Sequence, residues 1–100
     1  MSSQANQPLP EGFQLENYRI LRLLASGGFS FVYLAHDENE TPVAVKEYLP
    51  ATLALRTRDN PVPVVPEENL SSFRYGLKCF FEETCVIGIN LATHGQDIKT

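Results

Sequence analysis

The residues best suited to chemistry are a glycine pair and a lysine that ends a short apolar run further along the chain. The pair is Gly27-Gly28, and the run is Val43-Ala44-Val45-Lys46. Residues 29–33 alternate aromatic side chains with Ser and Val, which predicts a strand leaving the glycine loop. The segment Glu38–Pro42 contains Asn and Pro, which predict a turn between this strand and the lysine strand. The two strands hold the glycine loop, which has few side chains, above the ammonium of Lys46. This arrangement suits the binding of a polyphosphate.

This order of elements resembles the start of a eukaryotic-type protein kinase, whose signatures are G-x-G-x-x-G-x-V and, one strand later, V-A-I-K. In the resemblance Ala25 stands at the first glycine, Gly27 at the second, Ser30 at the third and Val32 at the valine. Two of the three glycines are therefore replaced by small residues, which visit positive φ less freely than glycine. The glycine pattern gains specificity from the correctly spaced lysine strand.

The resemblance implies an α+β fold, with about three twisted antiparallel strands and one packed helix forming the N-terminal part of a kinase small lobe. It also implies binding of ATP with Mg²⁺ and phosphorylation of protein serine or threonine. Lys46 matches the lysine that pairs with the α/β-phosphates, and Leu24, Val32 and Ala44 match positions that enclose the adenine. The implied ATP-binding residues are Leu24, Ala25, Ser26, Gly27, Gly28, Phe29, Ser30, Val32, Ala44 and Lys46.

A helix is predicted to begin at Ser71 or Ser72, because a serine hydroxyl can accept a hydrogen bond from a free N–H group there. An apolar stripe then recurs at helical spacing and comprises Phe73, Leu77, Phe80, Phe81 and Thr84.

In the kinase family this helix carries the glutamate that pairs with the strand lysine. Phe80-Phe81-Glu82-Glu83-Thr84 matches that context with Glu83 in the pairing role. Successive helix residues point ~100° apart, so only one of the two glutamates can face Lys46.

The segment between the lysine strand and this helix is longer than in most kinases. Prolines at 61, 63 and 66 exclude a helix there, so residues 51–69 are expected to form a surface loop. An insert after Val-Lys-Glu-Tyr-Leu-Pro is similar to a group of bacterial serine/threonine kinases. We expect a flexible leader over 1–15, a partial kinase small lobe over 16–90 and an unmatched tail over 91–100.

The resemblance ends after Thr84. Codons for residues 84–88, read one base later, can encode Arg-Ala-Leu-Leu-Ala, which would continue a kinase helix. The sequence leaves two origins for this segment open: a frameshifted or truncated gene, and a true gene product.

The acidic residues after Pro50 lie in neither a His-Arg-Asp nor an Asp-Phe-Gly motif. No catalytic residue is therefore assigned within this chain, and the isolated chain is expected to be inactive. The alternative function is a non-catalytic fragment that binds a nucleotide weakly or a protein partner.

Composition excludes several other classes. Eight basic and twelve acidic residues give a net charge of −4, without a basic stretch that would suit nucleic acid or an anionic membrane. Apolar runs stay below the ~20 residues that span a bilayer, and the polar, uncharged N-terminus is unlike a signal peptide. Cys79 and Cys85 fall on different helix faces, which argues against a disulfide, and two cysteines without a partner pair of histidines make no metal site. His36 and His94 receive no catalytic role, and a cytoplasmic location is expected.

Overall fold

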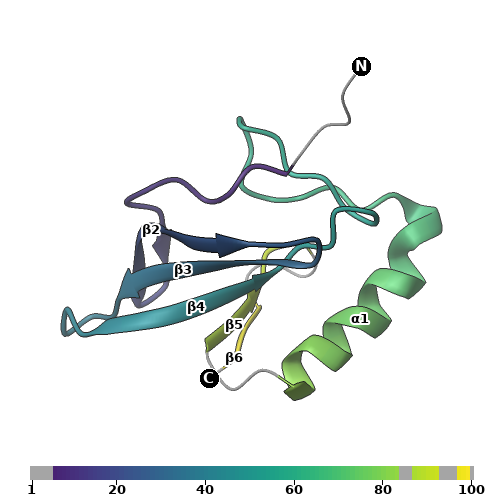
Figure 1. The fold of residues 1–100 in the computed structure, drawn as a ribbon. Helices are drawn as coiled ribbons and strands as arrows, with labels where there is room; N and C mark the ends of the chain where they lie inside the picture. Colours follow the sequence, from purple (N-terminus) through teal and green to yellow (C-terminus); the bar gives the residue numbers. More distant parts are fainter. Residues whose placement is uncertain (1–5, 84–86, 93–96, 100) are drawn as a thin grey trace.

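The computed structural model describes residues 6–83, 87–92 and 97–99. The described residues form one sheet in the strand order β1-β2-β3-β4-β5-β6 together with one α-helix (Figure 1). Neighbouring strands are antiparallel except for β4 and β5, which are parallel. The α+β prediction is confirmed. The elements are β1 Gln14–Leu15, β2 Tyr18–Ser26, β3 Ser30–His36, β4 Pro42–Tyr48, a 3₁₀ turn Glu67–Asn69, α1 Leu70–Glu83, β5 Ile87–Asn90 and β6 Asp97–Lys99.

The hairpin of β3 and β4 is the predicted aromatic strand followed by the predicted lysine strand. Its turn is closed by Asp37, whose Oδ1 accepts hydrogen bonds from the N–H groups of Asn39 at 2.8 Å and Thr41 at 2.9 Å. The left-handed backbone position in this turn is occupied by Glu40, with a φ of 61°, rather than by Asn39. The Asp37 bonds satisfy the turn locally, as is common for Asp in loops.

Side-chain alternation divides the sheet into two faces. Phe31, Tyr33, Ala35, Val45 and Glu47 are all buried and share what we call the core face. Val32, Leu34, Ala44 and Lys46 are partly exposed and share what we call the lysine face.

The core face is covered by the N-terminal segment and by the insert, which run above the strands in Figure 1. Leu9 and Leu15 are buried in the hydrophobic core. Residues 6–15 are thus anchored to the sheet at Leu9 and Leu15, in contrast to the flexible leader that the sequence predicts over 1–15. The expectation did not allow for the apolar core face, which needs a cover that this segment provides. Residues 1–5 lie outside the described residues.

The insert contains no α-helix among residues 51–66, as the prolines predict, but it is more than a surface loop. Leu55 and Val64 form an isolated antiparallel bridge. Ala54, Arg56 and Pro63 are buried. The insert is therefore a packed layer on the core face, held by a few inward-pointing residues.

The helix α1 begins at Leu70, directly after the 3₁₀ turn, so Ser71 and Ser72 lie in its first turn rather than before it. Pro66 precedes the 3₁₀ turn in an extended conformation, and its carbonyl accepts a hydrogen bond from Asn69 N at 2.8 Å. Phe73 is buried, and Leu77 and Phe80 pack against the core, which confirms this part of the predicted stripe.

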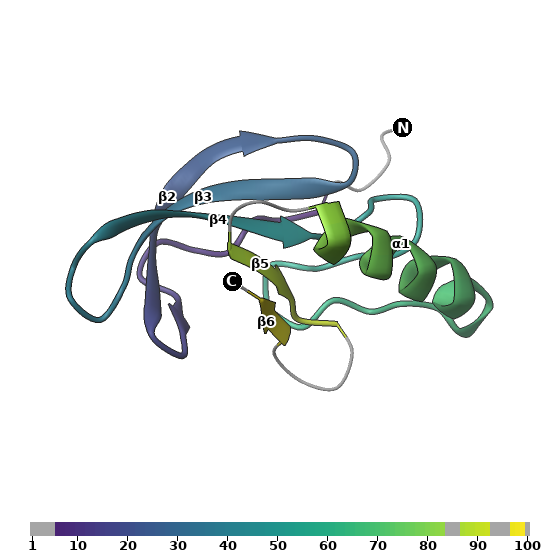
Figure 2. The same ribbon diagram turned by 90° about the horizontal axis from the view of Figure 1, so that it is seen from below.

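The C-terminal segment adds two strands that the sequence does not predict. Gly88 of β5 lies opposite Lys46 in the parallel pair. A parallel pair needs a long crossover, and α1 lies in the connection between β4 and β5. Figure 2 shows α1 beside this end of the sheet from below. The unmatched tail over 91–100 thus contributes β6 to the fold, while Cys85 and His94 lie outside the described residues.

Candidate functional site

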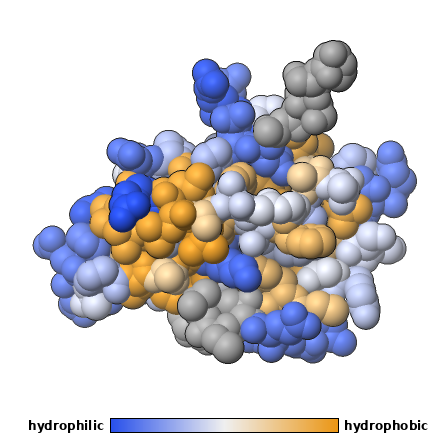
Figure 3. All heavy atoms as spheres, in the orientation of Figure 1, coloured by the Kyte–Doolittle hydropathy of each residue, from blue (hydrophilic) through white to orange (hydrophobic). Residues whose placement is uncertain are grey.

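Strands β2, β3 and β4, with the glycine loop between the first two, form what we call the glycine hairpin, and it brings four of the ten predicted nucleotide-binding residues to the lysine face. Val32 lies opposite Lys46, and Ala25 lies opposite Val32 in the neighbouring pair. Ala44 lies two residues before Lys46 on β4 and shares its face. Leu24 lies at a register shift between Leu23 and Ala25 and is 45% exposed. Hydrophobic residues gather over the region of the strands on the face that Figure 3 shows.

The glycine loop is the short connection between β2 and β3. It is closed by a hydrogen bond from Gly27 N to the Ser30 carbonyl at 3.0 Å, and Phe29 at its tip is 72% exposed. Neither Gly27 nor Gly28 uses the left-handed backbone region, and a Cβ added at either would meet open space. The fold itself therefore does not demand glycine at these positions. What glycine provides here is bare backbone at the tip.

Two carbonyls of the loop are bonded to the start of the insert. Leu49 N donates to the Phe29 carbonyl at 2.8 Å, and Ala51 N donates to the Gly28 carbonyl at 2.9 Å. Within the described residues, the N–H groups of Gly28 and Phe29 donate to no protein acceptor. Adjacent free N–H groups of this kind form anion-binding concavities.

The ammonium of Lys46 lies over the ring of Phe80, with 5.8 Å between Nζ and the ring centroid. It forms no ion pair with a carboxylate of the described residues, so the predicted Lys46–Glu83 contact is absent in this conformation. The α1 side chain that the ammonium contacts is Phe80, one turn before Glu83. A cation–π contact of this kind contributes ~0.5–2 kcal/mol.

Glu83 nevertheless lies on the sheet side of α1. It shares a stripe with Ser72, Gly76 and Cys79 that lines a groove of about 460 Å³ between the helix and the glycine-loop tip. Glu82 instead points to solvent, where its carboxylate lies 4.0 Å from the ammonium of Lys78. Of the two glutamates, Glu83 is the one placed next to the glycine hairpin.

A buried ionic network on the core face was not predicted. Arg56 donates to both carboxylate oxygens of Glu47, at 2.5 Å and 2.7 Å, and their side chains are 2% and 0% exposed. The Tyr33 hydroxyl donates to Glu47 Oε1 at 2.8 Å and accepts from Leu9 N at 2.9 Å. Arg56 Nε donates to the Gln7 carbonyl at 2.9 Å. The network joins β3 and β4 to both segments that cover them.

The pKa values of this network follow from its burial and charges. Burial raises the pKa of Tyr33 well above its ordinary value, and the negative charge of Glu47 adds to the shift. Burial lowers the pKa of Arg56, but the hydrogen bond and charge of Glu47 outweigh it and the pKa is raised. Arg56 is therefore charged and Tyr33 neutral over the physiological range.

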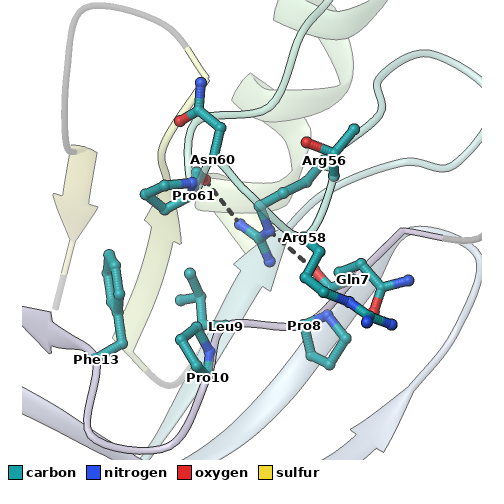
Figure 4. A pocket seen from close by; sticks show the side chains of 10 residues that line it. Gln7, Pro8, Leu9, Pro10, Phe13, Arg56, Arg58, Asn60 and Pro61 are labelled. Atoms are coloured by element: carbon teal, nitrogen blue, oxygen red, sulfur yellow. Dashed lines mark hydrogen bonds between the residues drawn. The ribbon is translucent and has the colours of Figure 1, made fainter.

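A second pocket of about 200 Å³ lies between the leader and the insert (Figure 4). Its lining includes Pro8, Leu9 and Phe13 from the leader and Arg58 from the insert. Because Glu47 and Lys46 point to opposite faces of β4, this pocket belongs to the core face and takes no part in the lysine site. His36 lies at the far end of β3, in register with Pro42.

Within the described ranges, no group of His, Cys, Asp and Glu side chains is arranged to hold a metal ion. The one described helix is neither long enough nor apolar enough to cross a bilayer.

The sheet, its glycine hairpin and α1 together give the fold of a fragment of a protein-kinase small lobe. PpkA-294, a bacterial serine/threonine kinase solved in its apo form, superposes on the chain with a TM-score of 0.70 and 35% sequence identity. The match covers 76% of this chain and 27% of that one, so the chain spans about a quarter of the structure it matches. No protein-family profile matches the chain. No curated protein sequence matches it either.

Proposed function

We propose that the lysine face binds ATP, and that in a longer chain with a catalytic loop it serves phosphorylation of protein serine or threonine. The observation that carries the proposal is that the strand register places three kinds of group near one another in the sheet. These are the Lys46 ammonium, the apolar surface of Val32 and Ala44, and the free N–H groups of the glycine loop. The kinase-like fold and the likeness to PpkA-294 support it.

The residues present fit the parts of a nucleotide. The partly exposed side chains of Val32 and Ala44 offer an apolar surface to a base. The N–H groups of Gly28 and Phe29 and the ammonium of Lys46 offer positive charge and donors to phosphates. Phosphoryl transfer depends mainly on positioning the phosphates and neutralising their charge. These residues would make the contribution of the small lobe to both. Magnesium would be held by the phosphates and by residues elsewhere.

Two features make the expected affinity of residues 1–100 low. The lysine face is half-exposed, so a base would be covered on one side only. Lys46 also has to leave the ring of Phe80 to reach a phosphate. Phe80 and Glu83 are three residues apart and so lie on one side of α1, which means that pairing with Glu83 would require Lys46 to leave Phe80 and reach about one turn further along the helix.

The test is a titration of residues 1–100 with magnesium and ATP, followed by backbone amide NMR shifts. We expect shifts to concentrate at Gly27, Gly28, Phe29 and Val32 and to weaken strongly in Lys46→Met, which deletes the ammonium. Lys78→Met is the matched control, because Lys78 is 72% exposed and lies on the solvent side of α1. Shifts confined to the leader–insert pocket, or unchanged by Lys46→Met, would contradict the proposal.

A further inference from the structure

The glycine loop is attached to the first residues of the insert by two backbone hydrogen bonds. The bond from Leu49 N to the Phe29 carbonyl continues the ladder of β3 and β4. The bond from Ala51 N to the Gly28 carbonyl, at 2.9 Å, lies beyond the ladder and reaches the loop tip. Ala51 itself is exposed, so its side chain is not held in the core.

The bond at Gly28 has a consequence for Phe29. The Gly28 carbonyl and the Phe29 N–H belong to one planar, trans peptide unit and point in opposite directions. When Ala51 holds the carbonyl, the Phe29 N–H is fixed on the side away from the insert. That N–H is one of the two free donors at the tip.

Ala51 is in turn held by the packed insert. The Pro50 carbonyl accepts hydrogen bonds from Leu53 N at 3.1 Å and Ala54 N at 3.0 Å, which closes a turn around Ala51. Asn6 of the leader accepts from Arg56 N at 2.6 Å and donates to the Ala54 carbonyl at 3.2 Å. A continuous set of hydrogen bonds therefore leads from the leader to the glycine loop.

We propose that Ala51 is a positioning residue whose backbone N–H pre-orients the glycine loop for phosphate binding. The inference deepens the proposed function and rests on it. An ordered donor loses less conformational entropy when a ligand arrives, so the bond should strengthen nucleotide binding.

Ala51→Pro deletes the N–H with little other change. Ala51 is the second residue of the turn that begins at Pro50, a position that favours proline. Ala51→Ser, which keeps the N–H, is the matched control. We expect Ala51→Pro to raise the Kd for magnesium-ATP roughly fivefold, the change that corresponds to one hydrogen bond of ~1 kcal/mol, and Ala51→Ser to leave it unchanged. An unchanged or tighter Kd in Ala51→Pro would overturn the proposal.

Two readouts without nucleotide separate this inference from the proposed function. Backbone relaxation of the Phe29 amide should show more motion in Ala51→Pro than in Ala51→Ser, and the Ala51 amide of the unaltered chain should be protected from hydrogen exchange. Fast exchange at Ala51, or equal motion in both variants, would overturn the positioning role even if ATP binds. ATP could fail to bind while the Ala51 amide is protected and the Phe29 amide moves more in Ala51→Pro. In that case the proposed function is wrong, and the role of Ala51 in ordering the glycine loop is supported.

Discussion

The hydroxyl of Tyr48 lies where a side chain on Gly76 would begin: a Cβ built on Gly76 would be 2.3 Å from Tyr48 Oη. The same hydroxyl donates to the Phe73 carbonyl at 3.0 Å, and the Tyr48 ring packs against Phe73 and Phe80 with centroids 4.9 Å and 5.4 Å away. Glycine at 76 thus lets α1 approach the end of the lysine strand.

Gly76→Ala should destabilise the fold, although alanine is the better helix former by up to ~1 kcal/mol. Overpacking typically costs ~1–3 kcal/mol, and to make room the Tyr48 hydroxyl would have to give up its hydrogen bond to the Phe73 carbonyl and shift its ring against Phe73 and Phe80. Tyr48→Phe removes the hydroxyl, so the same alanine should cost less in that background. Urea unfolding of the two single variants and the double variant measures this coupling. Additive free energies would contradict the contact.

The buried Glu47–Arg56 pair gives a second prediction. Arg56→Met leaves the Glu47 carboxylate uncompensated and should lower the free energy of unfolding by ~3–5 kcal/mol. Glu47→Leu combined with Arg56→Met should recover part of that loss, because no buried charge remains. Lys78→Ala breaks the exposed pair with Glu82 and should change stability by only a few tenths of a kcal/mol. Urea unfolding measures the free energy of unfolding of both variants. An equal decrease in Arg56→Met and Lys78→Ala would contradict the prediction that the buried network contributes more to stability than the exposed pair.

Tyr33 gives a prediction for alkaline pH. Its pKa is raised in the folded state by burial and by Glu47, whereas the unfolded side chain titrates near its ordinary value of about 10. Above about pH 10 the unfolded chain loses this proton while the folded chain keeps it. Stability should therefore fall as pH rises beyond 10, by up to ~1.4 kcal/mol per pH unit from this group. Tyr33→Phe should flatten that slope in urea unfolding across alkaline pH; an identical slope in both proteins would refute it.

The hairpin and the helix could be predicted because their signals are local. Alternation from Phe29 to Tyr33, the Glu38–Pro42 turn and the stripe from Phe73 to Phe80 each span only a few neighbouring residues. The kinase-like fold followed from the resemblance of the glycine loop and the Val43–Lys46 strand to kinase motifs.

The core-face network depends on contacts between distant segments and was missed. Arg56 lies in a proline-rich stretch and looks like a solvated residue. One clue was available. Strand alternation places Glu47 on the same face of the sheet as Tyr33 and Val45, and a carboxylate on an apolar face needs a partner. The Lys46–Glu83 contact could not be decided from the sequence, because helix rotation is set by the packing of Phe80 against Tyr48 and Lys46. That contact remains a prediction.

Gly28→Ala separates the role of the glycine loop in folding from its role in binding. The backbone there avoids the left-handed region and a Cβ would meet nothing within 4 Å, so the free energy of unfolding should stay unchanged or rise slightly. Binding of ATP should weaken, because the methyl group occupies space that a phosphate needs near the Gly28 N–H. Thermal unfolding and the NMR titration measure the two effects. A destabilised variant with unaltered ATP binding would show that Gly28 is needed for folding and not for binding.

The last prediction is that residues 1–100 do not transfer phosphate even when they bind ATP. A kinase needs an Asp near the substrate hydroxyl and an Asp and Asn at the magnesium ions. Asp59, Glu67 and Glu68 lie in the insert or the 3₁₀ turn, and none follows His-Arg or precedes Phe-Gly.

The assay is labelled ATP with magnesium and a generic protein substrate, beside Lys46→Met as the background. We expect equal, near-zero incorporation in both. Incorporation above that of Lys46→Met would show that the chain carries a catalytic base outside the kinase motifs. If ATP binds without transfer, the chain contributes nucleotide binding while the transfer chemistry depends on a second lobe.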